Sequence, residues 1–517
     1  MFLTRAGFGA PMESIMSQTG REATDWLREE FEKPATVYLP ETLATYDPDT
    51  TSFQNHQMLF WNAALDGDDE LRQRMVFALS QLFVVSNTGG TDQVLPLAYF
   101  MDVLSENAFG NYRDLMEEVT YSFSMARYLT YFRNRKGNPN TGRTPDENYA
   151  RELLQLFTIG LVELNPDGTP RLDAGGNTIE TYTNEDIVGL ARVFTGFTLK
   201  GPSFWDGDPD GQYSRLVTYP EQHSTLEKSF LGLTIPENTG PEASVEMALD
   251  HIFNHPNLAP FISRQLIQRF TASSPSPAYV ERVANAFETG AFAAANGEVF
   301  GSGQRGDLTA TLAAILLDES LFDGSAIGSP MSGKVREPVL RFAHWARAFD
   351  LDNVIAQNER WFRNVAGNNN RLGQYPFNSP SVFNFYRPGY IAPGTQTGEL
   401  GLTAPEFQII TQSSLIRTTN FLMRHVMDDT PRWDDAIVSF TPDYTDEIAL
   451  AEDPAALAEH LSLLLTSGFM SDASKDRIVA VLNEIPIRTD NVEEDRLTRV
   501  HVAVLMALST PAANIQY

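Results

Sequence analysis

The stretch DENYARELLQLFTIG, residues 146–160, has the residue spacing of an amphipathic helix. At 100° per residue, its polar residues fall within one arc of roughly 140° around the helix axis. We call these residues the polar stripe: Glu147, Asn148, Arg151, Glu152 and Gln155. The opposite side is apolar and consists of Tyr149, Ala150, Leu153, Leu154, Leu156 and Phe157. The pattern predicts a single helix over 150–159 with one face in a hydrophobic core.

The same spacing recurs through most of the chain. It predicts further helices over 72–85, 185–194, 260–270, 307–317, 335–349, 455–465 and 496–508. The segment YTNEDIVGLARVF also has a helix start signal, because Thr183 can cap the helix and Asp186 follows three residues later. We therefore expect more than half of the chain to be helical.

Two stretches depart from helical spacing. Short β signals gather within 161–235, where NPDG, AGGN and DGDPDG mark turns. Residues 367–394 are dense in Asn, Pro, Gly and aromatic residues. Neither an internal repeat nor a long linker divides the chain. The prediction is one large, mainly α domain over 1–517, with a hairpin-rich insertion at 161–235 that holds the few strands.

Composition excludes several classes of function. The chain has 517 residues, of which 42% are hydrophobic and 20% charged, as in globular proteins. Its formal charge of −29 disfavours binding to nucleic acids or anionic lipids. No apolar run reaches the ~18 residues that a membrane span needs. The absence of cysteine excludes disulfides, thiolate zinc sites and a cysteine nucleophile. The motifs of serine hydrolases, P-loop NTPases, zinc peptidases and Rossmann enzymes are also missing.

The polar stripe has two interpretations. Glu147 and Arg151 are four residues apart, as are Asn148 and Glu152, so each pair can touch on a solvated helix face. Alternatively, the stripe lines a site, with the polar segment 133–147 closing over the helix N-terminus, where unpaired N–H groups attract anions. Glu147 and Glu152 would then serve as acid and base for a substrate lying along the stripe.

Several further segments carry a family resemblance. ENYARELLQLFTIG followed by YTNEDIVGLARVFTGF resembles the bacterial domain-of-unknown-function 1800 family (DUF1800). The likeness extends over nearly the whole chain, through RAGFGA, RQRMVFALSQLFVVS, HSTLEKSFLG, HPNLAPFISRQLIQRF, GKVREPVLR, LGQYPFNSPSVFNFYRPGY and STPAANIQY. Two positions depart from the family pattern: Asp146 stands where the hallmark has Asn, and Ser224 where a later motif has Asp.

The resemblance implies a cellular location and a partner protein, but it does not imply a reaction. Family members usually carry an export leader, which implies a secreted or periplasmic protein whose leader is absent from this chain. The family's frequent genomic companion is the DUF1501 family, which looks like a sulfatase-type exported protein, and the resemblance thus implies a DUF1501-like partner. It names no substrate.

Two other polar segments are candidate sites. His223 and Lys228 can act as a general acid/base or an anion clamp, or can lie in an ordinary surface turn. DGDPDG matches the start of a calcium loop, with Asp206, Asp208 and Asp210 as metal ligands. The twelfth loop position is Val217 rather than Glu, so an Asp/Gly turn is the alternative.

The aromatic segment within 374–390 can stack sugar rings and bond their hydroxyls through amides. Its candidate substrate-binding residues are Gln374, Asn378, Phe383 and Asn384. The alternative is a packed core loop. GKVREP, 333–338, places Arg336 and Glu337 at a helix start, as a structural ion pair or as part of a site.

These observations leave two hypotheses. The first is an exported hydrolase or lyase acting on an extracellular polysaccharide. Glu147 and Glu152 would be its acid and base, Arg151, Asn148 and Lys228 would bind substrate, and His223 would assist. The second is a non-catalytic surface or scaffold protein that binds a glycan or the companion protein. On either hypothesis we expect the stripe to converge with other segments, above all with His223 or Lys228.

Overall fold

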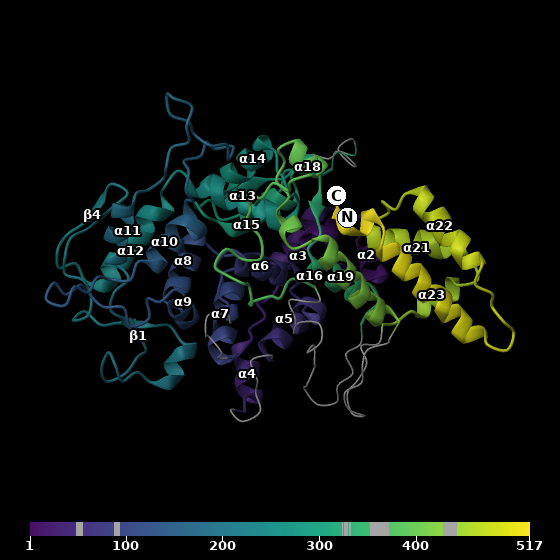
Figure 1. The fold of residues 1–517 in the computed structure, drawn as a ribbon, viewed down its shortest axis with the longest axis horizontal. Helices are drawn as coiled ribbons and strands as arrows, with labels where there is room; N and C mark the ends of the chain where they lie inside the picture. The colour runs from purple at the N-terminus through teal and green to yellow at the C-terminus, as the bar shows by residue number, and fades with distance from the viewer. Residues whose placement is uncertain are drawn as a thin grey trace.

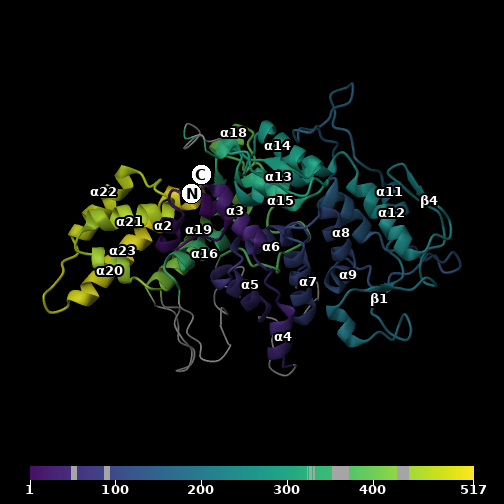
Figure 2. The ribbon, with the colours of Figure 1, turned by 180° about the vertical axis from the view of Figure 1, so that it is seen from behind.

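The computed structural model describes residues 1–47, 55–86, 94–322, 324, 329, 332–351, 372–427 and 442–517. Helices make up 52% of the structure, and the strands form only small two-stranded sheets within the described residues, which confirms the mainly α prediction. Three groups of elements follow one another along the longest axis of the molecule (Figure 1). Figure 2 shows the same order from behind.

The first group lies at one end of the molecule and contains the polar stripe (Figure 1). Its elements are α8 (Tyr112–Thr120), α9 (Phe123–Tyr128), α10 (Asn148–Glu152), the π-helix η2 (Leu153–Thr158), α11 (Asn184–Ala191), β1 (Phe197–Thr198), the 3₁₀-helix η3 (Pro209–Tyr213), β2 (Val217–Thr218), β3 (Lys228–Phe230), β4 (Leu233–Ile235) and α12 (Pro241–Phe253).

The second group forms the middle and is built from two parts of the chain. The N-terminal part supplies α1 (Phe2–Ala6), α2 (Met12–Gln18), α3 (Ala23–Glu32), α4 (Leu39–Thr45), α5 (Asn55–Asp66), α6 (Glu70–Ser80) and α7 (Val94–Glu106). The later part supplies α13 (Leu258–Phe270), α14 (Pro277–Thr289), β5 (Phe292–Ala293), β6 (Val299–Phe300), α15 (Leu308–Leu316), η4 (Glu319–Leu321), β7 (Lys334–Val335), α16 (Pro338–Ala348), α18 (Gln396–Glu399), η6 (Pro405–Gln408) and α19 (Gln412–Val426).

The third group lies at the other end of the molecule. It comprises α20 (Thr445–Leu450), α21 (Pro454–Thr466), α22 (Asp472–Asn483) and α23 (Val492–Leu508), after which α24 (Pro511–Asn514) and β8 (Ile515–Gln516) return to the middle. There β8 pairs antiparallel with β7, with Lys334 opposite Gln516.

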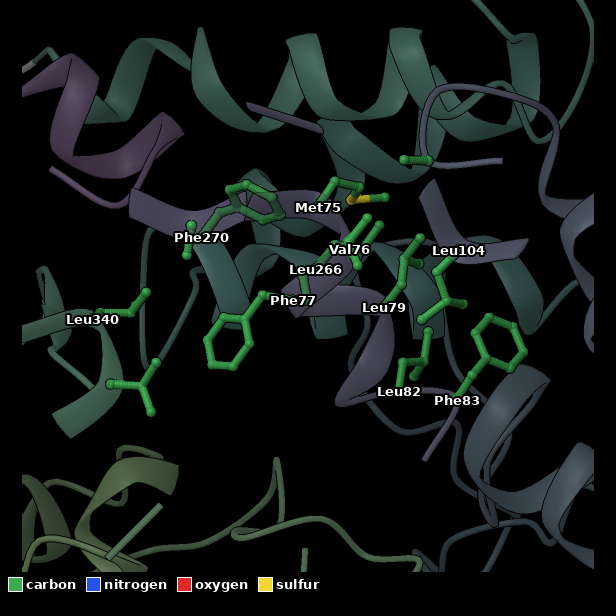
Figure 3. Packing of buried hydrophobic residues seen from close by; sticks show 14 of the residues in the cluster. Met75, Val76, Phe77, Leu79, Leu82, Phe83, Leu104, Leu266, Phe270 and Leu340 are labelled. Atoms are coloured by element: carbon green, nitrogen blue, oxygen red, sulfur yellow. The ribbon is translucent and has the colours of Figure 1, made fainter. Parts of the chain in front are cut away.

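Helix α6 is the centre of the hydrophobic core. All of its residues from Leu71 to Ser80 are buried, because other helices surround it on every side. Figure 3 shows Leu266 and Phe270 of α13, Leu104 of α7 and Leu340 of α16 around it. A helix buried on all faces has no solvated stripe. Its two arginines, Arg72 and Arg74, are therefore buried as well.

The predicted helices are present, and their ends differ by a few residues. Thr183 and Asp186 form the expected capping box at the start of α11. The range 335–349 becomes α16 from Pro338, since Val335 belongs to β7. The prediction that the strands gather in 161–235 is only half right. Strands β1 to β4 lie there, whereas β5 to β8 lie outside, where short pairings close turns and join distant segments. Within the described residues, no helix is both long and apolar enough to cross a bilayer.

Candidate functional site

The helix that carries the polar stripe changes its winding directly after Glu152. Residues 148–152 are α-helical, and 153–158 continue as a π-helix, so the predicted helix is present with an altered hydrogen-bond pattern. The Ile159 N–H donates to the Leu154 carbonyl at 3.0 Å, five residues back. π-Turns are rare and occur frequently at functional sites. The predicted apolar face is buried, with Leu153, Leu154 and Phe157 fully enclosed.

Within the stripe, Arg151 forms an ion pair with Glu147, which lies one turn before it on the helix. Arg151 Nη2 lies 3.3 Å from Glu147 Oε2, and both side chains are part-exposed. Asn148 does not bond Glu152 as its spacing allowed. Its Nδ2 donates to Thr130 Oγ1 at 3.4 Å, and its backbone N–H donates to the Asp146 carboxylate at 2.9 Å. The Asp146 carboxylate thus accepts the N–H of the first residue of α10.

Glu152 is the buried member of the stripe. Only 6% of the residue is exposed, and its Oε2 has no hydrogen-bond partner within the described part of the chain. Burial raises the pKa of Glu152, and the neighbouring Arg151 charge offsets only part of this effect. Tyr128 of α9 and Tyr182, which precedes α11, lie close enough for the Glu152 charge to help burial raise the pKa of each phenol to about 12.

The segment 133–147 packs beside this helix start rather than standing free. The Asp146 N–H donates to Asn134 Oδ1 at 3.0 Å, and Asn134 Nδ2 donates to the Phe194 carbonyl at 2.9 Å. The Lys136 N–H donates to the Gln222 carbonyl at 2.8 Å. The segment thus joins the stripe to the turn that precedes His223.

His223 is buried and holds two pieces of backbone together. Its Nδ1 donates to the Thr195 carbonyl at 2.9 Å, and its Nε2 lies 3.3 Å from Ser244 Oγ at the start of α12. Burial lowers the pKa of His223 to about 4, so the ring is neutral at neutral pH. Ser224 is enclosed beside it, and its N–H donates to Thr195 Oγ1 at 2.9 Å. This environment is that of a positioning residue.

Lys228 lies near His223 and not on the stripe. It is fully buried on β3, where Nζ donates to the Leu226 carbonyl at 3.5 Å. Burial, and then the charge of Arg192, lower its pKa. The hydrogen bonds described for His223 and Lys228 are with Thr195, Ser244 and Leu226 and not with the stripe, so their expected convergence with it stays a prediction. Tyr128, Thr130 and Tyr182 lie near the stripe.

The three aspartates of the calcium hypothesis serve local turns. Asp206, Asp208 and Asp210 are all exposed. Asp206 accepts from Ser203 Oγ at 2.9 Å, and Asp208 caps η3 by accepting the Asp210 N–H at 3.1 Å. The described residues contain no group of three or more acidic or histidine side chains arranged to hold a metal ion. This geometry gives the calcium hypothesis no support.

Most of the aromatic segment is part of the core, and residues 367–371 of the irregular stretch 367–394 lie outside the described residues. Gln374 is buried, and its amide donates to Glu337. Asn378 Oδ1 and Asn384 Nδ2 are shielded from solvent and have no hydrogen-bond partner in the described chain. Phe383 is exposed, with the Arg387 guanidinium 5.0 Å from its ring centre. Of these residues only Phe383 offers a ring to a sugar.

The structure adds a buried polar cluster that the sequence analysis recognised only in part. Glu337 Oε2 accepts from Gln81 Nε2 at 2.7 Å and from Gln374. Lys334 Nζ lies 3.3 Å from Glu337 and donates to Glu406 Oε1 at 2.6 Å. All of these charged groups are fully enclosed. Glu337 is thus not paired with Arg336, whose Nη1 lies 2.7 Å from His344 Nδ1. A charged residue on an otherwise apolar helix is the only sequence signal for such a cluster.

Two cavities lie away from the stripe. One of about 720 Å³ lies along α13 and α14, with Pro166, Pro260, Glu281 and Phe292 in its wall. The other, of about 240 Å³, is lined by α1, α2 and Ser467. Neither wall contains a stripe residue.

Comparison with known proteins gives one match. The family model described as a protein of unknown function (DUF1800) matches residues 1–515. The chain belongs to the DUF1800 family. No curated protein and no solved structure matches it.

Proposed function

We propose that this DUF1800 protein is an exported hydrolase or lyase that acts on an extracellular polysaccharide, with Glu152 as its general acid. The observation that carries the proposal is the state of the Glu152 carboxyl group, which is buried, has one unpartnered oxygen and has a raised pKa. A carboxylic acid must hold its proton near neutral pH to donate it, and burial is the usual means.

The neighbours of Glu152 support this role. Arg151 keeps its guanidinium part-exposed and pairs with Glu147 at one edge only, so its remaining N–H groups can bind a hydroxyl or carboxylate of the substrate. Tyr128 and Tyr182 retain their protons, because burial raises the pKa of each phenol to about 12, so each can donate a hydrogen bond. Glu147, which is part-exposed and paired with Arg151, is the second carboxylate that glycoside hydrolysis requires.

In this proposal Glu152 protonates the oxygen that leaves the cleaved glycosidic bond. In a hydrolase, Glu147 assists the attack of water at the sugar carbon. In a lyase, a base removes the proton next to an acidic sugar carboxylate, and Arg151 binds that carboxylate. His223 and Lys228 position the turn beside segment 133–147. The lack of cysteine and the family's usual leader support export, and the polymer class follows from that location.

The test is a screen of purified full-length protein against neutral, acidic and sulfated polysaccharides. Reducing ends report hydrolysis, and absorbance of an unsaturated product reports elimination. We expect activity on one class, loss of turnover in Glu152→Gln, and an unchanged fold. Glu147→Gln should lower the rate, and Gln155→Ala, on the same helix, should retain it. Activity that survives in Glu152→Gln would disprove the assigned role.

The second hypothesis, a non-catalytic glycan-binding or scaffold protein with a DUF1501-like partner, has one observation in its favour. His223, Lys228, Gln374 and Asn384 are enclosed by the fold rather than presented to a ligand. On this hypothesis the same polymers are bound without being cleaved. Binding by wild type and Glu152→Gln alike, with no product, would favour it over the enzyme.

A further inference from the structure

Two arginines meet in the interior of the middle group. Arg74 lies on α6 and Arg269 at the end of α13, and they are 1% and 3% exposed. Arg74 Nη2 donates to the backbone carbonyl of Arg269. Each guanidinium also lies over an aromatic ring, Arg74 at 4.7 Å from the centre of Phe270 and Arg269 at 4.9 Å from the centre of Tyr386. These contacts fix both groups in place.

Most of their hydrogen-bonding capacity is unused. In both arginines, Nε and Nη1 are shielded from solvent and have no hydrogen-bond partner within the described residues. The unmet donors are thus the same two nitrogen atoms on each guanidinium. A buried donor without a partner costs about 1–3 kcal/mol, and more when it is charged. Native interiors almost always satisfy such groups with protein, water or an ion.

The charges around them do not balance. The described side chains of this interior region comprise three cations, Arg74, Arg269 and Lys334, and two carboxylates, Glu337 and Glu406. Burial lowers the pKa of Arg74 to about 10, which still leaves it protonated at neutral pH. One positive charge is therefore in excess.

Both carboxylates already face other groups, and Glu337 Oε1 lacks a hydrogen bond among the described residues. Glu406 accepts from Lys334 and from Ser273 Oγ at 2.9 Å. Glu337 accepts from Gln81 and Gln374 through Oε2, and its Oε1 faces Lys334 at 3.3 Å. Burial acts to raise the pKa of Glu337, but Lys334, Arg74 and Arg269 outweigh it and lower that pKa. The arginines thus act on Glu337 through their charge, without a hydrogen bond to it.

We infer that Arg74 and Arg269 together bind one small monovalent inorganic anion of the chloride class. Such an ion accepts several N–H donors at once and supplies the missing negative charge. A water molecule would satisfy the donors and leave the charge in excess. The arginines are too enclosed for the carboxylate or sulfate of a polymer to reach, so this site is separate from the proposed substrate site at Glu152.

The bound anion would hold three elements together. Arg74 belongs to α6, Arg269 to α13, and the Tyr386 ring under Arg269 belongs to the aromatic segment. Tyr386 in turn donates from its hydroxyl to Gln81 Oε1 at 2.9 Å. Because the anion binds the folded state only, it should stabilise the protein in proportion to the logarithm of its concentration above the dissociation constant.

The first experiment uses the wild-type full chain. Melting temperature is measured in chloride, bromide and gluconate at one constant ionic strength, so that screening of the −29 net charge stays the same. We expect chloride and bromide to raise the melting temperature and gluconate not to do so. Crystals grown in bromide should show anomalous density within hydrogen-bonding distance of both guanidinium groups. Equal melting in all three salts, or water alone at that position, would overturn the inference.

A variant pair then localises the effect. Arg269→Met keeps an unbranched side chain over Tyr386 and removes the charge, so we expect the chloride-dependent increase to disappear. Arg264→Met removes a part-buried arginine from the same helix and should retain the increase in full. An unchanged chloride response in a folded Arg269→Met protein contradicts the site. If that variant does not fold, the bromide density in wild type decides alone.

Discussion

Arg151 pairs with Glu147, one helical turn back at 3.3 Å, and leaves Glu152, its neighbour in sequence, without a salt bridge. The pair lies at the surface, where an ion pair contributes little to stability. Removing the Glu152 charge therefore leaves the Arg151–Glu147 pair in place. In a purely structural network, the same change would leave Arg151 unpaired.

Glu152→Gln should stabilise the protein at neutral pH. Burial raises the pKa of Glu152 in the folded state above its unfolded value. The stability that this group contributes is therefore present at low pH and is lost as the pH rises through the folded pKa. We expect Glu152→Gln to melt a few degrees above wild type at pH 7 to 8, and the difference to shrink toward pH 4.5. A variant that melts lower than wild type at every pH would contradict the described environment.

His223 should show the opposite dependence. Its folded pKa of about 4 is below the ordinary value of 6.5. Its contribution to stability is therefore complete above pH 6.5 and is lost as the pH falls toward 4. Nitrogen-15 NMR should find a neutral ring at pH 6 with its proton on Nδ1. His223→Asn, which keeps a donor near that atom, should weaken the loss of stability in this window. A ring that titrates near pH 6.5 would refute the prediction.

Lys334→Met should be strongly destabilising. The change removes the ammonium that donates to Glu406 and lies 3.3 Å from Glu337, and breaking such a buried contact costs about 3–5 kcal/mol. Urea unfolding measures the effect. The double variant Lys334→Met/Glu406→Gln should recover part of the loss, because one uncompensated charge is removed. Lys475→Met, which removes a surface lysine, serves as the control and should leave the midpoint nearly unchanged.

Gly189→Ala should separate α11 from β3. A Cβ atom at residue 189 would lie 1.8 Å from the Ser229 carbonyl oxygen, so helix and strand must move apart. We expect a loss of roughly 3 kcal/mol or more, as overpacking of rigid backbone implies. Gly389→Ala, where no atom lies within 4 Å of the new Cβ, is the matched control. Equal unfolding midpoints for the two variants would show that the contact yields easily.

Local patterns predicted local structure well. The apolar spacing of Tyr149, Leu153 and Phe157 identified the buried face of the stripe helix, and Thr183 with Asp186 identified the start of α11. These features depend on residues within a few positions of one another, and the physics that forms them is equally local. The π-turn after Glu152 has no such signal, because both windings place the same apolar residues inward.

Burial of polar residues could not be predicted in this way. The helical wheel puts Glu152 on the polar arc, yet only 6% of the residue is exposed in the folded chain. In the sequence, His223 and Lys228 resemble surface residues. In the fold, Thr195 and α12 pack against this part of the chain. Arg74 resembles a solvated helix position, and only the packing of α13 and α16 shows that α6 has no solvated side. Each case depends on tertiary contacts that one sequence does not reveal.

The pairing of β7 with β8 has a consequence for synthesis on the ribosome. Gln516 is hydrogen-bonded to the Phe270 carbonyl at 2.6 Å and lies opposite Lys334, so residues made early and late share one wall of the interior. Contacts at such long sequence separation form slowly. The β7–β8 pair beside Lys334 can therefore form only after residue 516 has left the ribosome.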